Sequence, residues 1–243
     1  MILQGKNLEK SYNNSVLKTQ VLKGVDIEIK EGEFVSIMGK SGSGKSTLLN
    51  ILSSLDVADK GKIVFEERDI SNLSEEEAAK LRRESFGFVF QLPKMVKNLS
   101  ILDNILLPST NYRKNKKEVQ AKAKELMNRI GIGQIAGNKT SEASGGQLQR
   151  AGICRALIND PKILFADEPT GALDSKTGQE VLELFSAFHA EGKSILMVTH
   201  DVQVASRADR VLFMKDGLLV GELKQKADKK EGLRQIQEAV NSL

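Results

Sequence analysis

The first 66 residues contain two kinds of hydrophobic pattern. From 25 to 30, apolar residues alternate with charged ones, and 61–66 (GKIVFE) has the same character. Such alternation is typical of strands with one buried face. Between these stretches, 33–38 (EFVSIM) reads as a short buried strand and 46–55 (STLLNILSSL) as a helix. The pattern predicts a small antiparallel lobe packed against an α/β core.

The middle of the chain is mainly helical. Ser74 and Glu77 have the spacing of a capping box, which predicts a surface helix over 74–84. A strand at 86–90 (FGFVF) follows. From 92 to 159 the pattern is helical: one helix begins at Ser100 and Asp103 and ends before Pro108, and another covers 116–130. We interpret this stretch as a helical insertion into the α/β core.

Strand-like segments return in the last third of the chain, at 162–167, 193–199 and 210–214. They alternate with helix-like segments, which predicts a mostly parallel sheet covered by helices. Apolar residues in 228–243 recur at helical spacing, at Leu233, Ile236, Val240 and Leu243. We expect a C-terminal amphipathic helix that docks on its own domain.

Composition is that of an ordinary globular protein, with 40% hydrophobic and 28% charged residues among 243. No apolar run approaches the ~20 residues of a membrane helix, and the N-terminus does not resemble a secretory signal, so we expect a cytoplasmic location. Cys154 is the single cysteine, and its apolar neighbours predict a packed thiol.

Charge adds little to this picture. The balance of 36 Lys and Arg against 32 Asp and Glu gives a net charge of +4, which favours neither nucleic acid nor an anionic membrane strongly. A basic run lies at the start of the 116–130 helix, and we interpret it as a solvated helix start. It consists of Arg113, Lys114, Lys116 and Lys117.

The stretch 39–47 (GKSGSGKST) carries the clearest chemistry, because it fits the pattern G-x-x-x-x-G-K-[ST] between a strand and a helix. In such a loop backbone N–H groups surround phosphates, and the helix adds its positive N-terminal end. Lys45 would neutralise the phosphates and Ser46 would ligate Mg²⁺. The predicted phosphate-binding residues are Gly39, Lys40, Ser41, Gly42, Ser43, Gly44, Lys45, Ser46 and Thr47.

Polar residues also follow other strands of the predicted sheet. Ligands of open α/β sheets bind beyond the carboxyl ends of the strands, where this chain has Gln91, Asp167, Glu168 and His200. Asp167 can reach Mg²⁺ through its water shell, and Glu168 is placed to polarise a water for attack on the γ-phosphate. His200 would sense the same phosphate. His189, near a predicted helix end, is expected to be structural.

A second glycine-rich helix start, 144–150 (SGGQLQR), would be superfluous for a nucleotide already held by 39–47. A head-to-tail homodimer gives it a use, because each of two ATP molecules then lies between the phosphate loop of one chain and this helix of the other. The residues predicted to contact that ATP are Ser144, Gly145, Gly146 and Gln147.

These motifs together resemble the ABC ATPases, the nucleotide-binding subunits of ATP-binding cassette transporters, over residues 1 to about 222. Gly39–Thr47 resembles the Walker A loop, 163–168 Walker B and 144–147 the signature motif. Ala143 departs from the leucine that usually precedes Ser-Gly-Gly-Gln. The resemblance implies a P-loop NTPase fold of the α/β class with an inserted helical lobe at about 92–159 and a tail at 223–243.

The resemblance also implies roles for single residues. Gln91 is similar to the Q-loop glutamine and joins Ser46 and Asp167 as a predicted Mg²⁺ ligand, while Glu168, His200 and Gln91 form the predicted catalytic set. Asp174 lies in a GALD sequence similar to the D-loop and is predicted to contact the nucleotide. For Tyr12 the sequence allows a half-buried strand aromatic or a ring stacked on a base, and the resemblance favours the stacked ring.

Within the family, the sequence looks like the group that serves macrolide export, lipoprotein release and resistance to antimicrobial peptides. That group implies a separate membrane permease as partner, substrate contact through the permease, no nucleic acid, and a peripheral location at the inner face of the membrane. Leu92, Met95 and Val96 are either permease contacts or lobe core. Two other functions stay open: an ATPase that signals without transport, and a soluble ABC protein acting on DNA or ribosomes.

Overall fold

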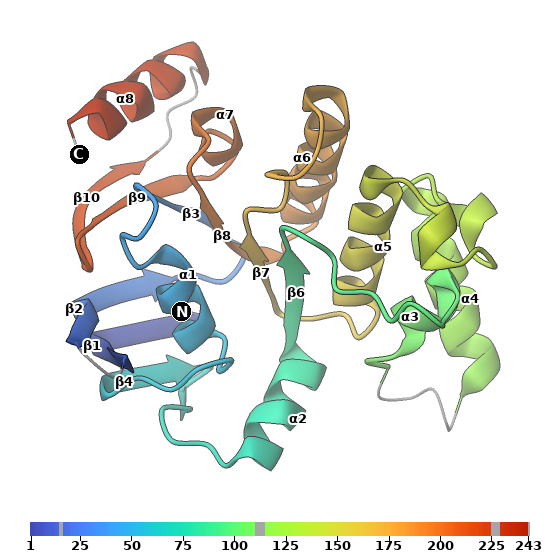
Figure 1. Cartoon of the computed structure of the whole chain (residues 1–243), viewed down its shortest axis with the longest axis horizontal. Helices are drawn as coiled ribbons and strands as arrows, with labels where there is room; N and C mark the ends of the chain where they lie inside the picture. The colour runs from blue at the N-terminus through green and yellow to red at the C-terminus, as the bar shows by residue number, and fades with distance from the viewer. Residues whose placement is uncertain (15–16, 110–114, 225–228, 243) are drawn as a thin grey trace. The chain divides into compact units, whose positions relative to one another are not determined.

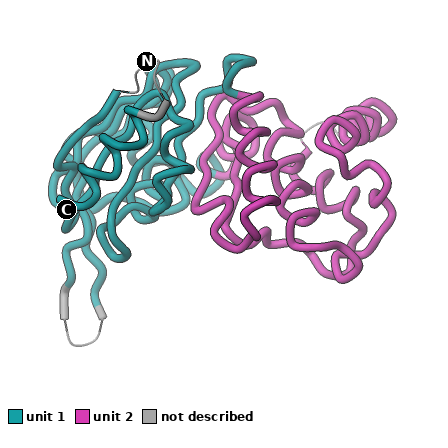
Figure 2. The backbone as a smooth tube through the Cα atoms, turned by 90° about the horizontal axis from the view of Figure 1, so that it is seen from above, with its two compact units in different colours: residues 1–78, 189–243 teal, residues 79–188 magenta. Residues whose placement is uncertain are grey.

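The computed structural model describes residues 1–14, 17–109, 115–224 and 229–242. Two compact units make up the chain, coloured separately in Figure 2. Unit 1 comprises residues 1–78 and 189–243, and unit 2 comprises residues 79–188. The predicted division into a domain of 1–222 and a tail of 223–243 is a different partition and stays a prediction.

Unit 1 contains an antiparallel sheet with the strand order β2-β1-β4-β5 (Figure 1). Its strands are β1 (Leu3–Asn14), β2 (Leu17–Ile29), β4 (Lys60–Phe65) and β5 (Arg68–Asp69). Apolar residues at 25, 27 and 29 are buried while the charged residues between them are exposed, as the alternation predicts. The predicted antiparallel lobe is confirmed.

The second sheet region of unit 1 is mostly parallel. Strand β3 (Phe34–Met38) pairs in parallel with β8 (Ser194–Thr199) and β9 (Arg210–Lys215). All five β3 residues are buried, which explains why its sequence is apolar except for Ser36 and does not alternate. Helix α1 (Lys45–Leu52) follows β3 after the phosphate loop, and α7 (Val202–Ala205) follows β8.

A further strand, β10 (Leu218–Lys224), was not predicted. It pairs antiparallel with β9 at the edge of this sheet, and most of its residues are exposed. Its apolar residues do not alternate with polar ones, because one strand neighbour is missing and neither face is well buried. Leu218 and Val220 are exposed apolar residues of this strand.

The C-terminal helix α8 (Lys229–Asn241) docks on unit 1, as its amphipathic pattern predicts. Ile236 is fully buried in a cluster with Val211 and Phe213 of β9, and Val240 packs against the same cluster. Leu243 lies outside the described residues. The apolar stripe of α8 is therefore used inside its own chain.

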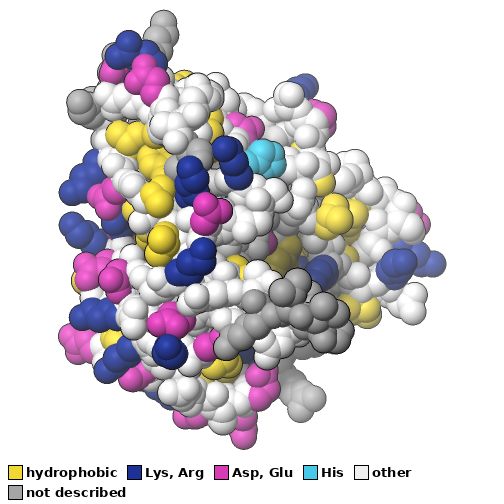
Figure 3. Space-filling model, turned by 60° about the vertical axis from the view of Figure 1, so that its left-hand side comes forward, with side chains coloured by type: hydrophobic (Ala, Val, Ile, Leu, Met, Phe, Trp, Pro, Cys, Tyr) yellow, Lys and Arg dark blue, Asp and Glu magenta, His cyan; other side chains and the backbone are white. Residues whose placement is uncertain are grey.

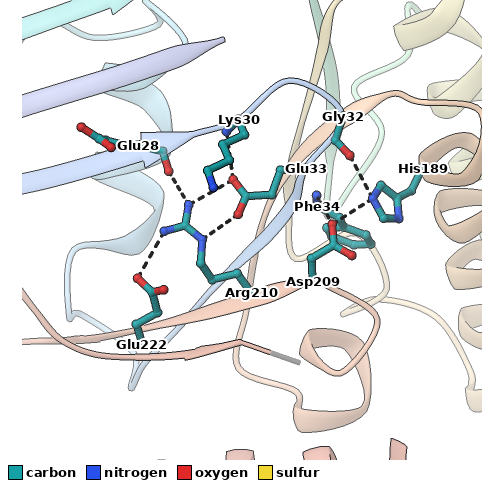
Figure 4. A network of polar contacts seen from close by, with 9 residues as sticks. All are labelled: Glu28, Lys30, Gly32, Glu33, Phe34, His189, Asp209, Arg210 and Glu222. Carbon is teal, nitrogen blue, oxygen red and sulfur yellow. Dashed lines mark hydrogen bonds and ion pairs between the residues drawn. The ribbon is translucent and has the colours of Figure 1, made fainter. Parts of the chain in front are cut away.

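A polar network ties the β2–β3 connection to β9 (Figure 4). The Arg210 guanidinium donates to Glu33 Oε1 at 2.8 Å and to Glu222 Oε2 at 3.2 Å. Burial lowers the pKa of Arg210, but its hydrogen bonds and ion pairs with Glu33 and Glu222 outweigh burial and raise it. Nearby, His189 Nε2 lies 3.0 Å from Gly32 O and 2.9 Å from Asp209 Oδ2. These contacts agree with the predicted structural role of His189.

Unit 2 is built on the parallel pair β6 (Phe86–Phe90) and β7 (Ile163–Asp167), with Phe86 and Phe165 in edge contact at 5.1 Å between ring centroids. Its predicted helices all form. They are α3 (Ile101–Leu106), α4 (Lys116–Arg129), α5 (Gly145–Leu157) and most of α6 (Ser175–Ala190), with short 3-10 turns at Gly133–Ile135 and Thr140–Glu142.

Helix starts follow the capping residues read from the sequence. Helix α2 (Glu75–Ser85), which crosses the boundary of the units, begins after Ser74, and Glu77 Oε2 accepts a hydrogen bond from the Ser74 N–H at 3.0 Å. Ser100 Oγ accepts from the Asp103 N–H at the start of α3. Arg113 and Lys114 of the basic run lie outside the described residues.

Two further expectations concern charge and membrane spans. On the face drawn in Figure 3, Lys and Arg side chains lie among Asp and Glu side chains, as the small net charge suggests. Within the described ranges, none of the helices combines the length and the apolar character needed to cross a bilayer.

Candidate functional site

The phosphate loop leaves the buried end of β3 and enters α1, as predicted. Gly39 has no room for a side chain, because a Cβ atom there would lie 2.2 Å from the Met214 carbonyl oxygen. Gly44 is the N-cap of α1 with φ at +106°, a backbone conformation that glycine adopts readily. The glycines of the motif therefore fix the path of the loop around the start of the helix.

Lys45 points into the loop that precedes it. Its Nζ donates to Gly39 O at 2.8 Å and to Lys40 O at 2.9 Å, and the residue is only 8% exposed. Buried ammonium groups need such partners, since an isolated buried charge is costly. The loop carbonyls hold a positive charge at the helix N-terminus, where the aligned peptide dipoles also attract anions.

Ser43 is a second buried polar residue of the loop. Among the described residues its hydroxyl has no hydrogen-bond partner, and it lies 2.7 Å from the position that a Gly39 Cβ would take. Buried polar atoms are normally paired, so an exception inside a motif of this type fits a loop built to bind phosphate oxygens. Ser46, the second residue of α1, is exposed, and Thr47 is half-buried.

Tyr12 lies on β1 and is 40% exposed. Its hydroxyl donates to Asp56 Oδ2 at 2.6 Å, and Lys10 Nζ lies 5.2 Å from the ring centroid. Lys10 Nζ also donates to Asp56 Oδ1 at 2.8 Å. Partial burial and the Asp56 hydrogen bond raise the pKa of the Tyr12 hydroxyl. The hydroxyl end of the ring is thus fixed, while the residue as a whole is partly exposed.

Lys10 and Asp56 were missed by the sequence reasoning. Lys10 lies two residues before Tyr12 on a strand and so shares its face, which is a signal that could have been used. Asp56 offers no comparable signal, because 44 residues separate it from Tyr12 and only the fold brings the two together.

His200 follows the last residue of β8 and is exposed. The residues around it are fixed by hydrogen bonds: Thr199 Oγ1 accepts from the Asp201 N–H at 3.0 Å, and Asp201 Oδ1 accepts from the Gln203 N–H at 2.7 Å. Asp201 thereby caps α7. His200 sits at a strand end, as predicted, next to a hydrogen-bonded turn.

Unit 2 brings together the ends of β6 and β7. Phe90 pairs with Asp167 in the parallel register, so Gln91 and Glu168 leave neighbouring strands at the same level. Glu168 has φ at +47°, a left-handed conformation that is uncommon outside glycine and costs about 1–2 kcal/mol. Strained residues of this kind cluster at functional sites.

The side chain of Gln91 lies over the turn that follows Glu168. Its Nε2 is 2.9 Å from the position that a Cβ of Gly171 would take. The same turn is closed by a hydrogen bond from the Gly171 N–H to Glu168 O at 3.0 Å. Gln91, Asp167 and Glu168 therefore belong to one local constellation within unit 2.

The Ser-Gly-Gly-Gln segment starts α5 with a complete capping box. Ser144 Oγ accepts from the Gln147 N–H at 3.3 Å, and Gln147 Oε1 accepts from the Ser144 N–H at 2.9 Å. A Cβ on Gly146 would meet Thr177 at 2.3 Å, whereas one on Gly145 would only reach van der Waals contact with Leu173 at 4.0 Å. Gly146 is thus explained by packing, and Gly145 leaves the helix N-terminus accessible. The helix forms although Ala143 precedes it.

Asp174 has a structural task at the start of α6. Its Oδ1 accepts from the Thr177 N–H at 3.0 Å and its Oδ2 accepts from Thr177 Oγ1 at 2.6 Å. These hydrogen bonds from Thr177 lower the pKa of Asp174. Its carboxylate caps the helix in this structure, a role that the sequence reasoning did not foresee.

The predicted site residues divide between the two units. Unit 1 holds Tyr12, the phosphate loop and His200, while unit 2 holds the Gln91, Asp167 and Glu168 constellation, the Ser144 helix start and Asp174. In the part of the chain that the structure describes, no three His, Cys, Asp or Glu side chains gather as a metal site. The predicted Mg²⁺ ligands, which include Ser and Gln, are of a different kind.

Comparisons with known proteins extend this picture. The family model of the ABC transporter matches residues 22–171. The bacitracin export ATP-binding protein BceA of Halalkalibacterium halodurans is 44% identical over 223 residues, which cover 91% of this chain and 88% of the relative. The macrolide export ATP-binding/permease protein MacB of Pasteurella multocida is 42% identical over 221 residues, which cover 91% of this chain but only 34% of the relative.

Solved structures agree with these relatives. The dimeric structure of MJ0796, a bacterial ABC transporter cassette, matches with a TM-score of 0.84 at 39% identity and covers 93% of this chain and 100% of that chain. A dimeric post-hydrolysis state of the same cassette bound to ADP and Pi matches with a TM-score of 0.82 at 38% identity, with the same coverage. The chain belongs to the ABC transporter family, as one of its nucleotide-binding ATPases.

Proposed function

We propose that this chain is the ATP-hydrolysing subunit that powers a separate membrane permease. The phosphate loop carries the proposal, because the Lys45 ammonium is fixed by two loop carbonyls at the start of α1. A charge fixed in advance loses little freedom when it meets a phosphate, which favours binding. The Tyr12 ring supplies a surface for the adenine, since aromatic faces stack well on bases.

The proposed Mg²⁺ ligands are Ser46, Gln91 and Asp167. All three offer oxygen atoms, which this hard cation prefers, so the donor set fits the ion. When bound, Mg²⁺ would neutralise charge on the phosphate oxygens. The remaining chemistry belongs to the protein's own side chains.

Glu168 is the proposed general base. Its carboxylate would take a proton from a water whose oxygen attacks the γ-phosphorus, while the bond from that phosphorus to the β,γ-bridging oxygen breaks and leaves ADP. The left-handed backbone at Glu168 and the Gln91 side chain over the following turn support a precisely held carboxylate. His200, at the end of β8, is proposed to contact the γ-phosphate.

The working form is proposed to be a head-to-tail homodimer with two ATP molecules. The accessible Gly145 at the start of α5 supports a second phosphate contact there, and the MJ0796 cassette is dimeric in its solved structures. ATP binding would favour the closed dimer and hydrolysis would release it. Work is then done through differential affinity for the two states.

The permease contact is proposed for the segment after Gln91. Leu92 is 68% exposed and Val96 is 47% exposed, whereas Met95 is half-buried and faces Gly152 and Arg155. Asn104, which is fully buried, fixes Val96 by accepting from its N–H at 2.7 Å and donating to its carbonyl at 3.1 Å. Leu92 and Val96 therefore suit a partner surface, and Met95 suits the lobe core.

A permease partner places the subunit at the inner face of the cell membrane. BceA is named for bacitracin export and MacB for macrolide export, and MacB combines ATP-binding and permease parts in one protein. By this relationship we propose antimicrobial peptides, macrolides or similar lipid-like compounds as the transported class. The substrate would contact the permease and not this chain.

The test is to trap the complex. Tagged Glu168→Gln protein is expressed in its native host, the membranes are solubilised with ATP present, and the copurifying proteins are identified by mass spectrometry. We expect a membrane-spanning permease, and a Leu92→Asp, Val96→Asp double variant should lose it. Recovery of ribosomes or DNA complexes in its place would overturn the proposal.

A further inference from the structure

Gln149 is a buried amide in the first half of α5 that no predicted role accounts for. It is only 1% exposed, and its Nε2 donates to two backbone carbonyls, Phe90 O at 3.0 Å and Pro169 O at 2.8 Å. Phe90 immediately precedes Gln91, and Pro169 immediately follows Glu168. One side chain therefore connects α5 with both loops of the proposed catalytic constellation.

We propose that Gln149 is a positioning residue that holds the Gln91 and Glu168 loops in register with the Ser144 helix start. The inference rests on the proposed roles of Gln91 and Glu168. The two segments that it contacts are far from it in sequence, since Phe90 lies 59 positions before Gln149 and Pro169 lies 20 positions after it. A shift of α5 along its axis would pull on both loops at once through rigid hydrogen bonds.

The side-chain oxygen of Gln149 also favours a positioning role over a role in packing alone. Gln149 Oε1 is buried and has no hydrogen-bond partner among the residues that the structure describes. A buried acceptor without a partner destabilises the fold. An apolar side chain of the same length would fill this space without that penalty, so the two donated hydrogen bonds are the feature that distinguishes glutamine here.

The backbone at Glu168 explains what the hydrogen bonds do. A left-handed residue persists only where its surroundings constrain it, and the turn from Glu168 to Gly171 is closed by its own hydrogen bond at 3.0 Å. The Gln149 amide adds a second constraint at Pro169 O, inside this turn. Without it the turn has more freedom, and the Glu168 carboxylate is held less accurately for proton transfer.

Gln149→Met is the first test, because methionine keeps the length and the apolar body and removes both N–H donors. The control is Asn159→Leu, which also removes an amide that donates to two carbonyls of unit 2, Arg83 O at 2.8 Å and Pro108 O at 2.7 Å, and neither of these acceptors belongs to a proposed site residue. We expect kcat of Gln149→Met to fall by about tenfold to a hundredfold, as small misplacements do. KM and the ATP dissociation constant should stay within about twofold of the wild type, because the phosphate loop is untouched.

Gln149→Asn is the second variant, in case the methionine protein does not fold. It keeps the amide but shortens it by one methylene, so that it no longer reaches both carbonyls, and the same loss of kcat is expected. The proposal is overturned if either folded variant retains wild-type kcat, or if Asn159→Leu loses as much activity per folded molecule. The proposed function has a separate readout: if wild-type protein fails to hydrolyse ATP, or Glu168→Gln hydrolyses it normally, the roles assigned to the site fail together with the inference.

Discussion

The Tyr12 hydroxyl and the Asp56 carboxylate meet in a hydrogen bond of 2.6 Å. Tyr12 lies on β1. Asp56 lies four residues after the end of α1, which is the helix that follows the phosphate loop. Lys10 strengthens the connection by donating to Asp56 Oδ1 and to Val57 O. The Tyr12 ring, proposed to stack on the adenine, is thus connected within unit 1 to the segment that follows the phosphate loop and α1.

This relationship predicts a loss of affinity that is specific for the base. Tyr12→Ala should weaken ATP binding by about 1–3 kcal/mol, the usual contribution of a base stacked on an aromatic ring. Binding of inorganic tripolyphosphate, which has no base, should not change. Isothermal titration with both ligands measures the difference. An equal loss for the two ligands would show that the ring acts on the phosphate loop and not on the base.

The hydrogen bond between Tyr12 and Asp56 can be tested separately from the aromatic ring of Tyr12. Tyr12→Phe keeps the aromatic face and removes the hydrogen bond to Asp56, so ATP affinity should fall by less than in Tyr12→Ala. Asp56→Asn should resemble Tyr12→Phe, because the paired charge that orients Lys10 and Tyr12 is lost while the ring remains. If Tyr12→Phe binds ATP as weakly as Tyr12→Ala, the ring face is not the binding element.

Lys45 gives a second prediction at the phosphate end. Lys45→Ala removes the ammonium from the loop and should weaken ATP binding roughly tenfold to a hundredfold, as expected for charge-assisted hydrogen bonds. Tripolyphosphate should lose affinity to the same extent, in contrast to Tyr12→Ala. Lys62→Ala, which removes an exposed lysine paired with Asp69, is the control and should bind both ligands normally.

Cys154 predicts how stability depends on alkaline pH. Burial raises the pKa of its thiol to about 12 from an ordinary value of 9.0. Between pH 9 and pH 12 the thiol is ionised in the unfolded chain but stays protonated in the folded chain. The stability that this group contributes is therefore fully present below pH 9 and is lost as the pH rises toward 12. The free energy of unfolding should fall by up to about 1.4 kcal/mol per pH unit from this group.

The measurement is urea denaturation of wild type and Cys154→Ala at several pH values. The alanine protein should be less stable at neutral pH, because a buried side chain is shortened, but its stability should fall less steeply between pH 9 and pH 11. Parallel curves for the two proteins would mean that the thiol ionises in the folded state at its ordinary pKa.

Much of this fold could be predicted because local patterns and buried faces coincide. The capping boxes at Ser74 and Ser144 mark helix starts by spacing alone, and the five buried residues of β3 mark a central strand. Strand β10 could not be predicted in this way, since its apolar residues neither alternate with polar ones nor form a run as long as a strand. The limit is physical: the sequence pattern records burial, and β10 has little.

In the candidate site, too, local sequence patterns could be predicted and contacts between distant segments could not. The loop around Lys45 could be predicted because its spacing reflects a backbone path within nine residues. Lys10 with Asp56 and Gln149 with Pro169 could not, because these pairs are made by tertiary packing of segments that are distant in sequence. Asp174 was predicted as a nucleotide contact, and only the structure reveals that its carboxylate caps α6.

The most direct measurement of the central claim compares ATP turnover and molecular mass of wild type and Glu168→Gln, with His189→Ala as control. Glu168→Gln should hydrolyse ATP about 10²- to 10⁴-fold more slowly, yet bind it and form a dimer of twice 26.7 kDa by light scattering. His189→Ala should keep its turnover and lose about 1 kcal/mol of stability with the Gly32 hydrogen bond. Wild-type turnover by Glu168→Gln, or a mass of 26.7 kDa for it at saturating ATP, would contradict the account.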